Sequence, residues 1–277
     1  LLNSITLDNA STSTNISGLG IDVNESSTIT SLAVGHTTPV SIASGKTLSG
    51  GITVTAGSIK LGETGTLASN ISMSDGTLDA DETLTLSGDL TQTGDMEIHV
   101  AQDKTLSYSG AAVNIGANKL TKNGKGTFNN TNALVLNNPS SKLFLGNETT
   151  VNSVSTSSNS LGVDVNDSST ITSLAVGHTT PVSIAAGKTL SGAITVTAGS
   201  IKLGETGTLA STVTMSGGTL DADETLTLSG ALSHSGDITI DVYSNKTLTY
   251  SGTAINVGAN TITLSGGGSL VSGGITL

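Results

Sequence analysis

The chain has 277 residues, with ten lysines, no arginine and 21 acidic residues, so its net charge is −11. A surface that follows phosphate groups needs clustered cations, so this balance argues against nucleic acid and anionic membranes as partners. The lack of cysteine excludes disulfides and thiolate metal sites, and the lack of tryptophan leaves a core built mainly from small aliphatic side chains.

The first long pattern is the segment SSTITSLAVGHTTPVSIA at 26–43, which returns unchanged at 168–185. Other segments recur with the same offset of about 142 residues, for example 52–69 at 194–211. We therefore predict one continuous β-solenoid over 1–277 with a long internal repeat of about 142 residues. The two copies cover about 19–160 and 161–277, and the second copy is incomplete.

A shorter period runs inside the long one. A threonine followed by an apolar residue recurs at intervals of roughly twenty residues, and seven such steps lead from Thr28 to Thr170. Seven coils of about twenty residues would therefore make one long repeat. In the first copy the steps are Thr28-Ile29, Thr47-Leu48, Thr66-Leu67, Thr83-Leu84, Thr105-Leu106, Thr127-Phe128 and Thr150-Val151.

Each short unit consists of brief strand patterns separated by turn residues. Segments such as 51–57 and 58–65 alternate apolar with small polar residues and then break at Gly, Asn or Asp. No segment shows the sustained 3.6-residue period of a helix. The pattern predicts an all-β fold, a right-handed parallel β-helix with three short strands per coil and about 20 residues per coil.

The ladder of Thr-apolar steps predicts which side chains form the core. Because neighbouring residues of a strand face opposite sides, we expect threonine outward and the following apolar residue inward. Leu84 and Leu226 are therefore expected to point into the coil. Tyr108 and Tyr250 follow ladder leucines by two residues, so we expect them on the same side, as fillers of the core or its corners.

The segment DADE, present in both copies, is the densest group of carboxylates in the sequence. Calcium prefers several carboxylate and carbonyl oxygens at a turn, so these side chains are calcium-ligand candidates. The EF-hand spacing and the glycine-aspartate nonapeptide of calcium-roll proteins are both absent. We expect a solvated acidic corner instead, with no cofactor and no catalytic residue. The candidates are Asp79, Asp81, Glu82, Asp221, Asp223 and Glu224.

Histidine could also indicate a metal or catalytic site. His36 and His178 occupy the same position in the two copies, so seven coils separate them and they cannot share a ligand. His99 corresponds to Asp241, and His234 to Gln92, so neither of these histidines is repeated. We therefore expect exposed histidines in turns or on faces.

Two other functions remain as alternatives. Some β-helices degrade polysaccharides, but a glycosidase needs paired carboxylates in a cleft, and this chain has neither aromatic platforms nor long loops to build one. An ice-binding solenoid would use a regular Thr-x-Thr array. The outward threonines make ice binding the nearer alternative, although the second position of the array changes among Ser, Ala, Thr and Asn along the first copy.

The segment GGTLDADETLTLSGALSHSGDITI at 217–240 resembles the Gly- and Thr-rich β-strand repeats of bacterial autotransporter passengers and filamentous-haemagglutinin-type adhesins. The resemblance lies in composition and periodicity over most of the chain. It implies a secreted bacterial surface protein that mediates adhesion or cell–cell contact, and it brings no catalytic residues with it.

We therefore expect a non-enzymatic extracellular rod, part of a longer surface fibre or adhesin stalk. The chain begins at Leu1 without a methionine or a signal peptide, so we interpret it as a segment of a longer protein. Neither end has the sequence of a polar cap, so we expect stacking to continue past Leu1 and Leu277. The expected partners are further coils or copies of the chain end to end, with a cell-surface or glycan receptor as a further possibility.

Overall fold

The computed structural model describes residues 4–7, 12–13, 16–17 and 20–276. They form an all-β parallel solenoid of about 13 turns with about 20 residues per turn, as predicted. These residues contain no helix, and so none that is long and apolar enough to cross a membrane. The right hand of the coil remains a prediction.

The chain divides into two compact units. Unit 1 comprises residues 1–134 and 150–152, and unit 2 comprises residues 135–149 and 153–277. The division lies about one coil before the predicted boundary of the two copies, at 160. Strands β19 (Leu134–Leu136) and β21 (Thr150–Thr156) have residues in both units.

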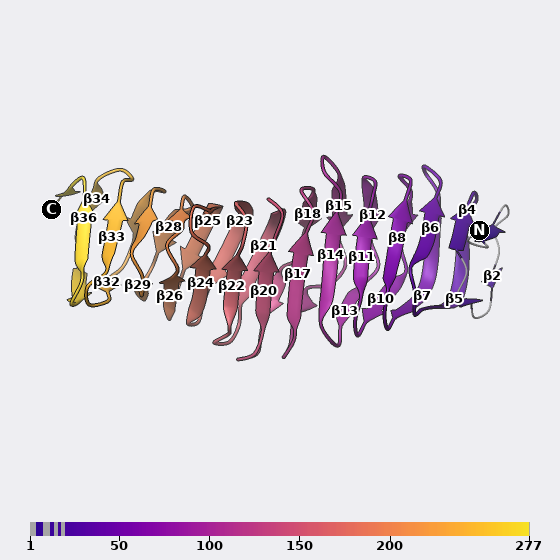
Figure 1. The fold of residues 1–277 in the computed structure, drawn as a ribbon, viewed down its shortest axis with the longest axis horizontal. Helices are drawn as coiled ribbons and strands as arrows, with labels where there is room; N and C mark the ends of the chain where they lie inside the picture. The colour runs from indigo at the N-terminus through magenta and orange to yellow at the C-terminus, as the bar shows by residue number, and fades with distance from the viewer. Residues whose placement is uncertain (1–3, 8–11, 14–15, 18–19, 277) are drawn as a thin grey trace. The chain divides into compact units, whose positions relative to one another are not determined.

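Unit 1 contains two long faces of parallel strands. The strands of the first face follow one another in sequence order along the ribbon (Figure 1). The first face consists of β1 (Ser4–Leu7), β4 (Gly20–Val23), β6 (Thr38–Ile42), β8 (Ser58–Gly62), β11 (Thr77–Ala80), β14 (Met96–Val100) and β17 (Lys119–Asn123). The second consists of β2 (Thr12–Ser13), β3 (Ile16–Ser17), β5 (Ser27–Val34), β7 (Thr47–Val54), β9 (Thr66–Leu67), β10 (Asn70–Met73), β12 (Leu84–Leu86), β13 (Leu90–Gln92), β15 (Thr105–Tyr108), β16 (Val113–Asn114) and β18 (Thr127–Asn130).

Unit 2 is built in the same way and adds a small sheet of two strands. Its first face consists of β20 (Lys142–Leu145), β22 (Gly162–Val165), β24 (Thr180–Ile184), β26 (Ser200–Gly204), β29 (Thr219–Ala222), β32 (Ile238–Val242) and β35 (Ile262–Gly266). Its second consists of β23 (Ser169–Val176), β25 (Thr189–Val196), β27 (Thr208–Leu209), β28 (Thr212–Met215), β30 (Leu226–Leu228), β31 (Leu232–His234), β33 (Thr247–Tyr250) and β36 (Ser269–Ser272). The small sheet pairs β34 (Ile255–Asn256) with β37 (Ile275–Thr276).

One coil is one strand of the first face followed by two strand segments of the second. The coil β11–β12–β13 has three separate short strands, as predicted. In β5, β7, β21, β23 and β25 the two segments join into one strand of seven or eight residues. A register shift between Ile29 and Leu32 marks the corner inside β5, where it pairs with β7.

The core is a column of aliphatic side chains inside the coils. Leu84 and Leu226 are each 5% exposed, which confirms the predicted inward direction. Tyr108 and Tyr250 are also buried, which confirms their interpretation as fillers. The Tyr108 hydroxyl donates to the carbonyl of Ala111 at 2.6 Å and accepts from the amide of Leu90 at 3.1 Å, so this buried polar group is satisfied.

The alignment of the Thr-apolar steps differs from the sequence-based prediction at two places in each copy. Thr66 lies beside Thr85, not beside Thr83. On its other side, Leu84 pairs with Leu106 in the next coil, as the steps predict. In the same way Thr28 lies beside Ser49, not Thr47. Each offset is two residues, and strand side chains alternate with a period of two, so the inward and outward assignments survive the shift.

Candidate functional site

The acidic segment of the first copy lies at the end of one strand and in the bend that follows. Asp79 lies in β11 between Leu78 and Ala80, both fully buried, so the alternation of the strand turns the carboxylate outward. Asp81 and Glu82 lie in the bend before β12. The three carboxylates therefore occupy the outer surface of one corner of the coil.

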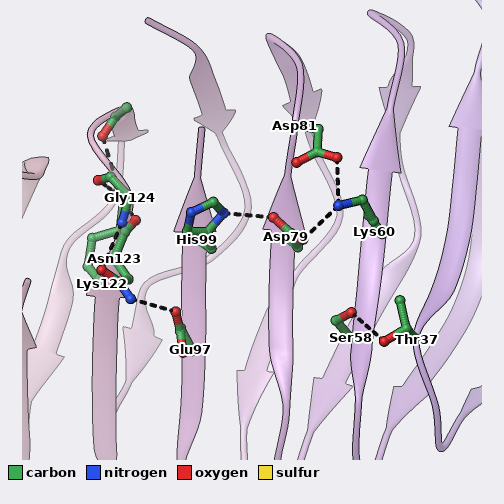
Figure 2. A network of polar contacts seen from close by, with 11 residues as sticks. Thr37, Ser58, Lys60, Asp79, Asp81, Glu97, His99, Lys122, Asn123 and Gly124 are labelled. Atoms are coloured by element: carbon green, nitrogen blue, oxygen red, sulfur yellow. Dashed lines mark hydrogen bonds and ion pairs between the residues drawn. The ribbon is translucent and has the colours of Figure 1, made fainter. Parts of the chain in front are cut away.

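Lysines of the two adjacent coils pair with these three carboxylates. Lys60 is the direct strand partner of Asp79, and its Nζ lies 2.8 Å from Asp81 Oδ2 and 3.5 Å from Asp79 Oδ2 (Figure 2). Lys104, in the following coil, binds Glu82. The hydrogen bond to Asp81 and the charge of Asp79 raise the pKa of Lys60, so this lysine stays protonated.

The second copy pairs the equivalent residues, with the nearer and the farther aspartate exchanged. Lys202 Nζ lies 2.8 Å from Asp221 Oδ2 and 3.6 Å from Asp223 Oδ2, and Lys246 binds Glu224. All six calcium-ligand candidates thus have a lysine at ion-pair distance. Within the described residues, no three His, Asp or Glu side chains converge in a way that could hold a metal ion.

The lysine partners of these carboxylates were not predicted, although the sequence contains a signal for them. The tripeptide Lys-Thr-Leu occurs four times, and each lysine binds an acidic side chain 21 or 22 residues earlier, which is one coil away. We call these four pairs and those of Lys60 and Lys202 the lysine ladder. The four pairs are Lys46–Glu25, Lys104–Glu82, Lys188–Asp167 and Lys246–Glu224.

The two copies differ at one position beside the ladder. In the first copy, His99 Nδ1 lies 2.7 Å from Asp79 Oδ1, so the chain of contacts extends from Lys60 through Asp79 to the imidazole (Figure 2). In the second copy, Asp241 takes the place of the imidazole and lies opposite Asp221. Two carboxylates are therefore adjacent on neighbouring strands.

The replacement of the imidazole by Asp241 contributes to a shift in the pKa of Asp221. Its side chain is 12% exposed, and burial is the main cause that raises the pKa of its carboxyl. The nearby charges of Asp223 and Asp241 raise this pKa further, whereas the ion pair with Lys202 lowers it. Burial and like charge outweigh the lysine, so the net direction is upward.

The repeated histidines lie apart from these charges. His36 and His178 are exposed in the bends that follow β5 and β23, which confirms the predicted turn positions. Their backbone carbonyls accept hydrogen bonds from Thr38 Oγ1 and Thr180 Oγ1, at 3.1 and 3.0 Å. These contacts order the bend and leave the imidazoles at the surface.

A shallow concavity on the first face of unit 1 carries further charged residues. Asp75, Asp95, Glu97 and Lys119 line it. The Asp75 carboxylate accepts from the amide of Gly76 at 2.7 Å, and that of Asp95 accepts from the amide of Lys119 at 2.8 Å. The Asp75 carboxylate therefore orders its own turn, and that of Asp95 joins its coil to the start of β17 in the next.

No protein-family model, curated protein sequence or solved structure matches this chain. The lysine ladder consists of ion pairs in which a lysine of one coil binds a carboxylate of the adjacent coil. These ion pairs connect successive coils along the solenoid.

Proposed function

We propose that the chain is a segment of a non-enzymatic extracellular rod that acts as a surface fibre or adhesin stalk. The observation that carries the proposal is the repeated lysine ladder. The pairs of Lys60 with Asp79 and Asp81 recur as those of Lys202 with Asp221 and Asp223. They lie at strands with matching bounds, β8 and β26, and β11 and β29. A module that repeats together with its axial contacts can lengthen a solenoid without redesign of any core.

The proposed partners and location follow from the ends of such a rod. A coil at the end of a solenoid offers a row of backbone N–H and C=O groups, and pairing with a further coil satisfies them. We propose that further coils or other copies stack end to end, outside the cell, and that a cell-surface or glycan receptor is bound. Leu1 and Leu277, where we expect stacking to continue, lie outside the described residues.

Fibre diffraction and electron cryo-microscopy of native material test this proposal. We expect a meridional spacing of about 4.8 Å, strands perpendicular to the fibre axis, and a long period of about 34 Å for seven coils. A discrete monomer whose two ends are closed by ordered polar caps would contradict the proposal.

Ice binding is the second candidate, and a run of aligned threonines favours it. Thr47, Thr66 and Thr85 lie side by side on neighbouring coils. The run then continues through Ser107 and Asn129, which interrupts the array. Assays of thermal hysteresis and ice recrystallisation test this function. We expect background values, and an activity that Thr66→Val abolishes would establish ice binding instead.

Polysaccharide degradation is tested by hydrolase and lyase assays on acidic and neutral glycans, with and without calcium. We expect no turnover, because Lys60 pairs with both Asp79 and Asp81 at the outer corner of the coil. An activity lost in both Asp79→Asn and Asp81→Asn would overturn the structural interpretation.

A further inference from the structure

A hollow of about 400 Å³ lies in unit 2, between the coil that contains β31 and the coil that contains β34. Strand β31 pairs with β28 of the coil before it, whereas β34 pairs with β37 in a separate sheet. Within the described residues, no ladder joins β31 to β34. The hollow is far larger than one water molecule needs, and its volume lies in the range of small-molecule sites.

Tyr250 keeps the two coils apart at one end of this hollow. Its hydroxyl accepts from the amide of Leu232 at 3.1 Å and donates to the carbonyl of Thr253 at 2.5 Å. The phenol oxygen therefore stands where a direct backbone bond between the coils would run, so the strands do not close to ladder distance there. Because this bridge closes one end, the hollow suits a compact ligand and not an added strand that runs through it.

The backbone on both sides of the hollow offers donors and acceptors. The amides of Ile255 and Val257 donate to the next coil, so the alternation of the strand turns the amide and carbonyl of Asn256 the other way, to the hollow. On the opposite side, the amide of Leu232 faces Tyr250, so the carbonyl of Leu232 and the amide of His234 face the hollow as well.

One residue exchange between the copies leaves this corner open. In the first copy, Gln92 Nε2 donates to the carbonyls of Gly94 in its own coil and of Lys119 in the next, both at 2.9 Å. In the second copy, His234 Nδ1 donates to the carbonyl of Gly236 at 2.9 Å, so in the neutral ring Nε2 is an acceptor. This Nε2 is shielded from solvent and has no partner among the described residues, so the side chain makes no bond to the next coil.

The side chains that line the hollow are uncharged. Hydroxyl and amide groups both donate and accept hydrogen bonds, whereas a charged ligand would find no counter-ion here. Small apolar side chains, Ala254 among them, form the rest of the wall. The polar side chains of the lining are those of Ser233, His234, Thr253, Asn256 and Asn260.

We propose that this hollow binds one uncharged sugar residue of a glycan. The inference rests on the proposed glycan receptor and gives its binding site a position on the chain. Neighbouring sugar hydroxyls each donate and accept, which matches the carbonyl of Leu232, the amide of His234 and the two amide groups of Asn256. Asn260 adds a further amide, and the C–H face of the sugar ring would lie against Val257.

The test is an NMR titration of the full chain with methyl α-glucoside, methyl β-galactoside, methyl α-mannoside and N-acetylglucosamine. At least one sugar should shift the backbone amides of His234 and Asn256 in a saturable manner, with a millimolar Kd because one sugar makes few contacts. Asn256→Ala should raise this Kd about tenfold. Asn114→Ala, at the equivalent position of the first copy, should leave it unchanged. His234→Gln, which copies Gln92, should close the hollow and abolish the shifts.

Four results would overturn the proposal. The first is the absence of saturable shifts with every sugar, which leaves the rod itself to be judged by fibre diffraction. The second is a set of saturable shifts at other amides only, which would place the glycan elsewhere on the chain. The third is an equal response to glycerol, or a response to the peptide acetyl-Thr-Val-Thr-amide alone. The fourth is a Kd that neither Asn256→Ala nor His234→Gln changes.

Discussion

Lys122 is the side chain whose burial has the largest electrostatic consequence. Burial lowers the pKa of Lys122 to about 7, from 10.5 in the unfolded chain. Between these two values the unfolded chain binds a proton that the folded chain does not. The free energy of unfolding therefore rises as the pH increases from about 7 to about 10.5. Below pH 7 both states are protonated and the unfavourable contribution is constant.

The variant Lys122→Met should remove this dependence on pH. At pH 7 we expect it to be more stable than the unmodified protein by up to about 4 kcal/mol, the upper limit set by the pKa shift. Chemical denaturation at pH 7, 8, 9 and 10 measures the difference. The difference in free energy of unfolding between the variant and the unmodified protein should narrow as the pH rises. Two parallel curves of stability against pH would contradict the lowered pKa of Lys122.

Asp221 gives a second test at the scale of one residue. Its pKa is raised in the folded chain above 3.8, so the folded chain binds more protons than the unfolded chain just above that pH. The stability that Asp221 contributes is present at low pH and is lost as the pH rises through its folded pKa. The repulsion from Asp241 is one cause of this loss.

The variant Asp241→His copies the first-copy arrangement into the second. We expect it to raise the free energy of unfolding by about 0.5–1 kcal/mol at pH 6, because an imidazole replaces a like charge beside Asp221. Asp241→Asn is the control, because it removes the repulsion without adding a cation, and it should give part of the gain. A loss of stability in both variants would show that the bond from Ser265 Oγ to Asp241 matters more.

At the scale of the elements, glycines decide where one strand can pass close to another. Gly50 lies in β7 with a φ of 120°, and a Cβ atom there would lie 1.6 Å from the carbonyl oxygen of Ile29 in the previous coil. Gly45 has a φ of 74° but no heavy atom within 4 Å of such a Cβ. Gly50 therefore combines a positive φ with a close contact, whereas Gly45 has the positive φ alone.

Alanine substitutions at these glycines should differ in cost. Gly50→Ala should lower the free energy of unfolding by about 2–4 kcal/mol, because the backbones of β5 and β7 must move apart. Gly45→Ala should lower it by about 1 kcal/mol, from the positive φ alone. Urea denaturation measures both values. Equal costs would mean that the contact with Ile29 relaxes freely.

At the scale of the whole molecule, the repeat predicts that one period can be removed. Residues 30 and 172 are equivalent, so a chain in which Thr30 is joined directly to Ser173 lacks one full period, 31–172, but keeps the order of coils. Because each coil contacts only its neighbours, we expect this shortened chain to fold with the same β content per residue. Circular dichroism and the cooperativity of unfolding are the measurements. An unfolded or aggregated product would show that the two copies are not interchangeable.

The sequence by itself determined the class of fold and the direction of the core side chains. The alternation in segments such as 58–62 and the recurrence of Thr-Leu and Thr-Val steps depend on local chemistry, since most inward positions are apolar. The inward leucines, the buried tyrosines and the exposed turn histidines were all predictable for this reason. They need no knowledge of which residue lies in the next coil.

Only the tertiary structure decided the register between coils and the partners of the charged side chains. A shift of two residues keeps every side chain on its predicted face, so the pattern cannot distinguish Thr83 from Thr85 as the neighbour of Thr66. The pairing of Lys60 with Asp79 and Asp81 depends on that register. The hydrogen bond from the buried Lys122 Nζ to the carbonyl oxygen of Asn123 depends on the path of the turn. Backbone carbonyls carry no signal in the sequence, so the acceptors of a buried lysine appear only once the chain is folded.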